Sequence, residues 1–230
     1  MQIRYRWYSI QLPRGTPDLP AVIDDYPFGQ ETNQGFTRVN GALGHLIHRF
    51  LWRSKVVVTQ LDENGDPAYQ EVETVNFTDF AIINIDDAVF LRIENPGRSI
   101  KELLNALESM IGLGFTCKLI TFDKKKPTTV FEDIEVIKLI GLKVTGAVLG
   151  EDLVARMEFA STEGITPEKL TVLANVPHKT DSASYELIYG GLRGLLSFNS
   201  NGTVKVSGQL APKLIHLVEQ DLAEVARLTA

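Results

Sequence analysis

The chain has 230 residues, of which 44% are apolar and 23% are charged; 23 basic and 29 acidic side chains give a net charge of −6. These proportions are typical of folded soluble proteins and exclude a disordered chain. No apolar run reaches the roughly 18–20 residues of a membrane-spanning helix, and the start, MQIRYRWYSIQLPRG, lacks the apolar core of a signal peptide. We therefore expect a cytoplasmic protein with no membrane contact.

The first elements are expected to be a strand, a long loop and a helix. Apolar and polar residues alternate over 3–12, which predicts a strand. Residues 13–37 are rich in Pro, Gly, Asp and Asn and predict a long loop, with one short turn of helix as an option. Helical spacing of apolar residues predicts a helix over 42–52, although a strand or an early end is an alternative there. The residues with that spacing are Leu43, Leu46, Ile47, Phe50 and Leu51.

An antiparallel meander is predicted next. Its strands are expected at 56–61, 68–75, 79–85 and 88–95. Asn64-Gly65 is a typical hairpin turn between the first two, and Asp86-Asp87 joins the last two. Pro96-Gly97 then ends the meander.

The second half is expected to mix helices with strands. Ser99 as N-cap and Glu102 three residues later predict the start of a helix over about 100–112. Residues 129–139 fit either a helix or a strand. Further helices are expected at 167–174 and 211–228, and strands at 115–122, 142–149 and 153–160 and around a hairpin turn at 199–202.

These elements together predict the fold class α+β. It would have mainly antiparallel sheets in meander runs and four or five helices, including a C-terminal amphipathic helix. Pro96-Gly97 suggests an N-terminal β-meander lobe with one helix at 1–97 and a C-terminal α+β lobe at 98–230, closely packed on the first. A single domain is the alternative.

Charge is unevenly distributed in the first half. Residues 32–61 contain no acidic side chain and four basic ones, whereas residues 62–91 contain eight acidic side chains and no basic one. On the predicted helix, His45, Arg49 and Trp52 would share a side that could bind an anion or a nucleic-acid backbone. The candidate nucleic-acid or anion contacts are Arg38, His45, Arg49, Trp52, Arg53, Lys55 and Arg98.

The acidic segment offers a second candidate surface, for a basic protein partner. Its candidate contacts are Asp62, Glu63, Asp66, Glu71 and Glu73. The simpler alternative is that the basic and acidic segments neutralise each other as surface ion pairs of little energy. The net negative charge weighs against nucleic acid as the main ligand.

No complete catalytic or metal-binding set is recognisable in the sequence. His45 and His48 are three residues apart but lack a third ligand in any known motif, and Cys117 lies in an apolar run typical of a buried thiol. The glycines at 189–194 lack the spacing of a phosphate-binding loop. Asp86 and Asp87, or Asp133 and Glu135 with Lys138, are weak candidates for a nuclease centre. We therefore expect no catalytic residue, no metal and no cofactor.

The leading functional hypothesis is a non-enzymatic interaction subunit or adaptor of a larger assembly, with another protein as its partner. The charge pattern is suited to steering association. Two alternatives are kept: a protein that binds or cleaves nucleic acid through a local basic and aromatic face, and a small-molecule enzyme with a site built from loops 13–37 and 175–183. The sequence indicates neither the oligomeric state nor the identity of the partner.

Overall fold

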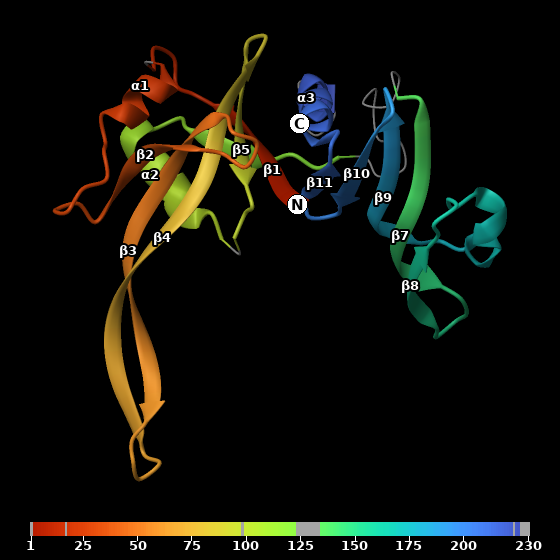
Figure 1. Ribbon diagram of the computed structural model, residues 1–230, viewed down its shortest axis with the longest axis horizontal. Coiled ribbons are helices and arrows are strands. Elements are labelled where there is room, and N and C mark those ends of the chain that lie inside the picture. The colour runs from red at the N-terminus through yellow and green to blue at the C-terminus, as the bar shows by residue number, and fades with distance from the viewer. Residues whose placement is uncertain (1, 17, 98, 123–133, 223, 226–230) are drawn as a thin grey trace. The chain divides into compact units, whose positions relative to one another are not determined.

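A computed structural model describes residues 2–16, 18–97, 99–122, 134–222 and 224–225 (Figure 1). In that part of the chain, strands are hydrogen-bonded in the order β2-β3-β4-β5-β1-β11-β10-β9-β7-β8, with β6 beside β1. The strands are β1 (Gln2–Gln11), β2 (Gln34–Asn40), β3 (Leu46–Leu61), β4 (Pro67–Ile85), β5 (Ala88–Glu94), β6 (Thr116–Leu119), β7 (Val136–Val148), β8 (Val154–Ala160), β9 (Lys179–Tyr189), β10 (Leu192–Asn199) and β11 (Val204–Gly208). The helices are α1 (Leu19–Asp24), α2 (Lys101–Ile111), α3 (Ala211–Gln220) and the 3₁₀-helix η2 (Pro167–Leu173).

The predicted α+β fold class with four or five helices is wrong, because the described residues form mainly one large antiparallel sheet of eleven strands. The helices are short, and the longest, α2, has 11 residues. None of the helices in the described ranges has the length and apolar character needed to cross a membrane.

The predicted helix over 42–52 is a strand, and its burial explains the error. β3 pairs with β2 and β4, so this part of it is an inner strand of the sheet. Successive side chains of a strand point to opposite faces, and both Ile47 and Phe50, on opposite faces, are buried. A strand buried on both faces places apolar residues at irregular intervals, which here imitate the spacing of a helix.

Several predicted elements are confirmed. Gly65 adopts a φ of +86° at the β3–β4 turn, as a tight hairpin turn beside Asn64 requires. Helix α2 is present, but its N-cap is Ile100 rather than the predicted Ser99. Ser99 Oγ accepts the Lys101 amide at 3.1 Å. The hairpins β7–β8 and β10–β11 form as expected. The ambiguous segment 129–139 enters strand β7 at Val136, while 129–133 lie outside the described residues. Residue 223 and residues 226–228 of the predicted 211–228 helix also lie outside them.

The chain divides into two compact units that are interleaved in sequence. Unit 1 contains residues 1–10, 83–95 and 118–230, and unit 2 contains residues 11–82 and 96–117. The expected division into 1–97 and 98–230 stays a prediction, because compact packing does not show which parts fold independently.

In unit 1, α3 packs on β10 and β11. Gly194 of β10 makes this contact close, because a Cβ there would lie 2.7 Å from the Leu210 Cβ and 2.9 Å from the Leu214 Cδ1. The apolar side of α3 is buried through Leu214, Ile215 and Val218. Helix η2 contributes Leu173 to a second cluster, with Val144 and Ala147 of β7.

A buried ionic cluster also joins α3 to the sheet of unit 1. Arg92 of β5 donates from Nη1 to Glu219 Oε1 at 2.7 Å and from Nη2 to Glu94 Oε1 at 3.3 Å. The side chain of Arg92 is only 8% exposed. Trp7 Nε1 donates to the same Glu219 oxygen at 3.2 Å. Burial, followed by the charge of Glu94, raises the pKa of the neighbouring Tyr5 above its ordinary value, so its hydroxyl stays protonated.

In unit 2, aromatic residues from neighbouring strands form the buried centre. The ring centroids of Phe36 and Phe50 lie 5.1 Å apart, and Phe80 meets Phe36 edge-on at 6.0 Å. Leu19 and Ile23 of α1 and Leu103 and Leu107 of α2 are also buried. This core supports only the first half of the β3–β4 hairpin, because the burial of β3 gives way to exposure from Lys55 onwards.

Candidate functional site

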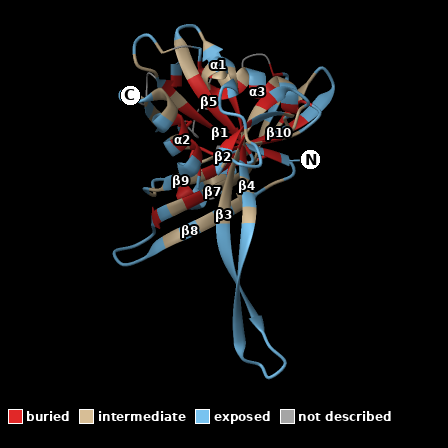
Figure 2. Cartoon of the chain, turned by 90° about the vertical axis from the view of Figure 1, so that its left-hand side faces the viewer, coloured by how far each residue is buried: buried red, intermediate tan, exposed pale blue. Residues whose placement is uncertain are grey.

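The outer part of the β3–β4 hairpin is the most unusual feature of unit 2. We call it the arm: residues 54–61 of β3, the turn 62–66 and residues 67–74 of β4. Every arm residue from Lys55 to Glu73 is exposed (Figure 2). A solvated two-stranded ribbon of this length has no core of its own, and isolated hairpins are marginally stable in water.

Hydrogen bonds fix the arm at its tip and at its base. At the tip, Asp62 Oδ1 accepts the amides of Asn64 and Asp66, each at 2.8 Å. At the base, Ser54 Oγ lies 3.0 Å from Thr74 Oγ1, and Asn76 Nδ2 donates to Ser54 Oγ at 2.7 Å. The register between β3 and β4 continues without a bulge from His48–Phe80 to Leu61–Pro67. The arm is therefore a regular ribbon rather than an irregular loop.

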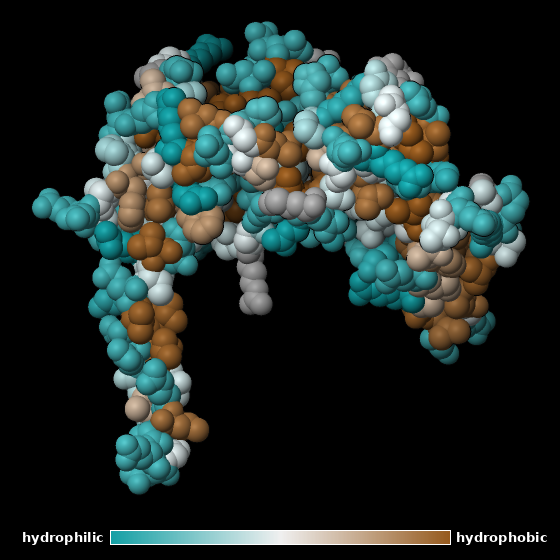
Figure 3. Space-filling model, viewed as in Figure 1, coloured by the Kyte–Doolittle hydropathy of each residue, from teal (hydrophilic) through white to brown (hydrophobic). Residues whose placement is uncertain are grey.

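Apolar side chains stand on both faces of the arm. On one face are Val57 (58% exposed), Leu61 (72%) and Tyr69 (71%), and on the other are Val56, Val58 and Val72. Figure 3 shows apolar side chains along the length of the arm, among hydrophilic ones. Single exposed apolar residues are ordinary on protein surfaces, but a continuous series is typical of an interaction surface.

All five acidic residues that the sequence indicates as partner contacts lie on the arm. Asp62, Glu63 and Asp66 form the turn, and Glu71 and Glu73 follow on β4. Lys55 is the only basic residue of the arm. The arm is thus acidic overall, and its tip carries three carboxylates without a cation.

Four of the predicted basic residues each have a carboxylate partner. Arg49 donates two hydrogen bonds to Asp79, at 2.6 and 2.8 Å, which raises the pKa of Arg49. The ion pair of Arg53 with Glu73 measures 3.4 Å and that of Lys55 with Glu71 measures 3.2 Å. On the neighbouring strand, Arg38 pairs with Asp24 of α1. The pairs of Arg49, Arg53 and Lys55 agree with the simpler alternative, in which the basic and acidic segments neutralise each other. Asp24 lies outside the acidic segment.

The helical face that grouped His45, Arg49 and Trp52 does not exist, because these residues lie on or just before a strand. His45 precedes β3, and Arg49 and Trp52 point to opposite faces. Trp52 stacks on Phe50 with centroids 5.4 Å apart. Trp52 also lines a cavity of about 590 Å³ with Ser54 and Asn76. Arg98 lies outside the described residues, and the role of these residues as contacts stays a prediction.

Catalytic chemistry finds little support elsewhere. Within the described ranges, no group of three or more His, Cys, Asp or Glu side chains is arranged to hold a metal ion. Burial raises the pKa of Cys117 to about 12, so its thiol is a poor nucleophile at neutral pH. Asp133, one of the weak nuclease candidates, lies outside the described residues.

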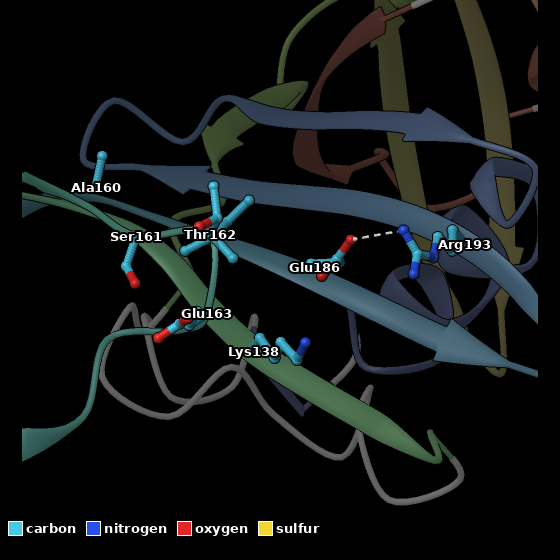
Figure 4. Close-up of a pocket in the computed structure, with 8 residues that line it drawn as sticks. Lys138, Ala160, Ser161, Thr162, Glu163, Glu186 and Arg193 are labelled. Carbon is cyan, nitrogen blue, oxygen red and sulfur yellow. Dashed lines mark ion pairs between the residues drawn. The ribbon is translucent and has the colours of Figure 1, made fainter.

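An open cavity of about 820 Å³ in unit 1 is lined by side chains of both charges (Figure 4). Glu186 and Arg193 face each other there at 3.8 Å, with Lys138 and Glu163 nearby. Two cations and two carboxylates line the cavity, so it has no net charge that would select an anion or a cation. Nothing in it forms a nucleophile–base pair.

Comparison with known proteins gives no independent assignment. No family model, no curated protein and no solved structure matches this chain.

The exposed apolar series of the arm is what sequence reasoning missed. The run Val56-Val57-Val58 predicts a strand correctly, but a run of β-branched residues ordinarily indicates a buried strand. The partner strand held a signal of this exposure. Its sequence, AYQEVETV, carries charges among its apolar residues and offers no continuous apolar face that a core could cover. A long hairpin in which neither strand has one apolar face and one polar face indicates a ribbon that projects into solvent.

Proposed function

We propose that this protein is an interaction subunit of a larger assembly and that the arm is the element that contacts another protein. One observation carries the proposal: both strands of the arm expose apolar side chains, and these stand on both faces of the ribbon. Covering them would remove apolar surface from water, which is the main driving force of protein association. A partner would also stabilise a ribbon that is marginal by itself.

The ion pairs explain why protein is favoured over nucleic acid as the partner. Arg49, Arg53 and Lys55 are each engaged by a carboxylate, and the arm is acidic overall. Binding of nucleic acid depends on cations that are free to displace counterions from phosphates. An acidic arm repels phosphate, whereas apolar and acidic side chains together fit a protein surface.

A shortened arm tests the proposal. Replacing residues 57–71 by Asn-Gly keeps the Val56–Val72 pair and closes it with a tight turn. The control replaces the β7–β8 turn residues 150–152 by Asn-Gly. Tagged versions of the full chain and both variants are recovered from native extract after nuclease treatment, and the co-purifying proteins are quantified.

We expect a stoichiometric protein partner, which includes further copies of this chain, to be retained by the full chain and the control and lost from the shortened variant. Circular dichroism establishes that all three are folded. Equal recovery by the shortened variant would refute the role of the arm. Loss of the partner on nuclease treatment would favour the nucleic-acid alternative instead.

A further inference from the structure

We infer that the partner of the arm is a second copy of this chain, joined by antiparallel pairing of the two β3 edges around Val58. This inference rests on the proposed function, because it specifies what covers the arm. Three features support it: the outward direction of backbone groups on β3, the charges on each strand, and the charge difference between the tip and the base of the arm.

The outer edge of β3 is open along the arm. β2 pairs with β3 only as far as Trp52, and the Arg53 amide then donates to Asn33 O at 2.9 Å on the same side. Backbone groups alternate along a strand, so the amides and carbonyls of Lys55, Val57, Thr59 and Leu61 also point to this side. In the described part of the chain, no strand pairs with β3 there beyond Trp52. Such an edge is a template for another strand.

The charges of the two arm strands select β3 rather than β4 as the pairing edge. Residues 54–61 include Lys55 and no acidic side chain, and three of them are consecutive valines. On β4, Glu71 and Glu73 lie two residues apart. Antiparallel pairing of two β4 strands around Val72 would place these carboxylates opposite each other, which is unfavourable. Charged residues on an edge strand are a common means of preventing pairing.

Antiparallel pairing of two β3 edges is favourable in charge. With Val58 opposite Val58, Lys55 faces Leu61 of the second copy, and Glu63 of that copy lies diagonally next to Lys55. The acidic tip of each arm thereby comes to lie beside Lys55 of the other, whose side chain is 73% exposed next to its partner Glu71. The two-fold symmetry gives this contact twice, as expected for an isologous dimer, the most frequent form of oligomer. Val56, Val57 and Val58 of both copies then adjoin in one four-stranded ribbon.

The first test changes the backbone. Val57→Pro removes an amide that points outward, while the hydrogen bonds between β3 and β4 involve the alternate residues and remain. Val57→Thr is the matched control, because it keeps the amide and the β-branched shape. Light scattering after size exclusion is expected to give twice 25.5 kDa for the wild type and the threonine variant, and 25.5 kDa for the proline variant.

The second test exchanges charges between the copies. Glu63→Lys or Lys55→Glu alone is expected to weaken the dimer about tenfold, and the double variant is expected to restore it. Residues 55 and 63 are about 26 Å apart within one strand-and-turn, at about 3.3 Å per residue, so restoration requires a contact between copies. Glu151→Lys, an exposed charge reversal in the β7–β8 turn, is expected to leave the dimer unchanged.

The outcomes separate this inference from the proposed function. A wild-type chain that is monomeric at about 100 µM, or a proline variant that dimerises like the wild type, would overturn the β3 pairing. If a different protein still requires the arm for recovery from extract, the proposed function stands without the dimer. If the shortened arm changes neither mass nor recovery, both are refuted.

Discussion

Replacing Arg92 by methionine should destabilise unit 1 more than the loss of any exposed ion pair. Arg92 separates two carboxylates, Glu94 and Glu219, whose side chains are 5% and 14% exposed. Without the cation, both carboxylates stay buried and lose the charge of Arg92. Breaking a buried ion pair in this way costs about 3–5 kcal/mol, which is a large part of the 5–15 kcal/mol typical of whole domains.

The control is Lys143→Met, also in unit 1. Lys143 pairs with Glu158 at 2.9 Å, but the two side chains are 42% and 64% exposed. Water screens such a pair, and its loss is expected to cost less than about 1 kcal/mol. A double variant, Arg92→Met with Glu219→Gln, should recover part of the lost stability. It removes one uncompensated charge and leaves an amide oxygen to accept the Trp7 hydrogen bond.

Urea unfolding followed by tryptophan fluorescence measures these effects. Trp7 is fully buried, contacts Glu219 and reports on unit 1 once Trp52 is replaced by phenylalanine. We expect the urea midpoint of Arg92→Met to fall well below that of Lys143→Met, with the double variant between Arg92→Met and the parent. Equal midpoints for the two single variants would show that the cluster does not stabilise α3 on the sheet.

Three further predictions concern single positions. Burial lowers the pKa of His48 below its usual value of about 6.5. The folded chain therefore binds this proton less tightly than the unfolded chain, and the free energy of unfolding falls as pH drops below that value. Replacing His48 by Phe should reduce the loss in urea midpoint between pH 7.5 and pH 5, and an unchanged loss would contradict this. Gly194→Ala should lower the free energy of unfolding by about 1–3 kcal/mol, because the added Cβ would press on Leu210 and Leu214. Gly29→Ala is the control: a Cβ at Gly29 meets no atom within 4 Å, so the free energy of unfolding should change by less than about 0.5 kcal/mol. Thermal unfolding of both variants tests this difference. Cys117 should be alkylated at pH 8 at least about 100-fold more slowly in the folded chain than in urea. Comparable rates by mass spectrometry would contradict the raised pKa of this half-buried thiol.

The sequence predicted local structure better than the overall fold class. Asn64-Gly65 has one dominant structural meaning, and the hairpin it predicts is present. Helix α2 was predictable because its apolar residues face one way and Ser99 precedes it. The 42–52 segment was not, because Ile47 and Phe50 are buried on opposite faces of an inner strand. Pairing with β2 and β4 decides that structure, and the apolar spacing within 42–52 does not reveal this pairing.

The charges of the candidate site were predictable from the sequence, but its exposure was not. The acidic and basic segments stood out by their charge, and the β3–β4 register explains why they are consecutive: they are the two strands of one hairpin. What the charges do not reveal is exposure. Val57 and Tyr69 could have been covered by another layer, and only the three-dimensional arrangement shows that no described residue covers them.

Hydrogen exchange of the arm tests the central claim most directly. The protein is isolated from its native source without denaturation, and the exchange of residues 54–61 is compared with that of the chain diluted alone. We predict slow exchange of the amides of Lys55, Val57 and Thr59 in the isolated assembly and fast exchange on dilution. The base of the hairpin near Phe50 is expected to stay protected in both samples. Equally fast exchange of the arm in both samples would mean that no partner covers it, and would contradict the account.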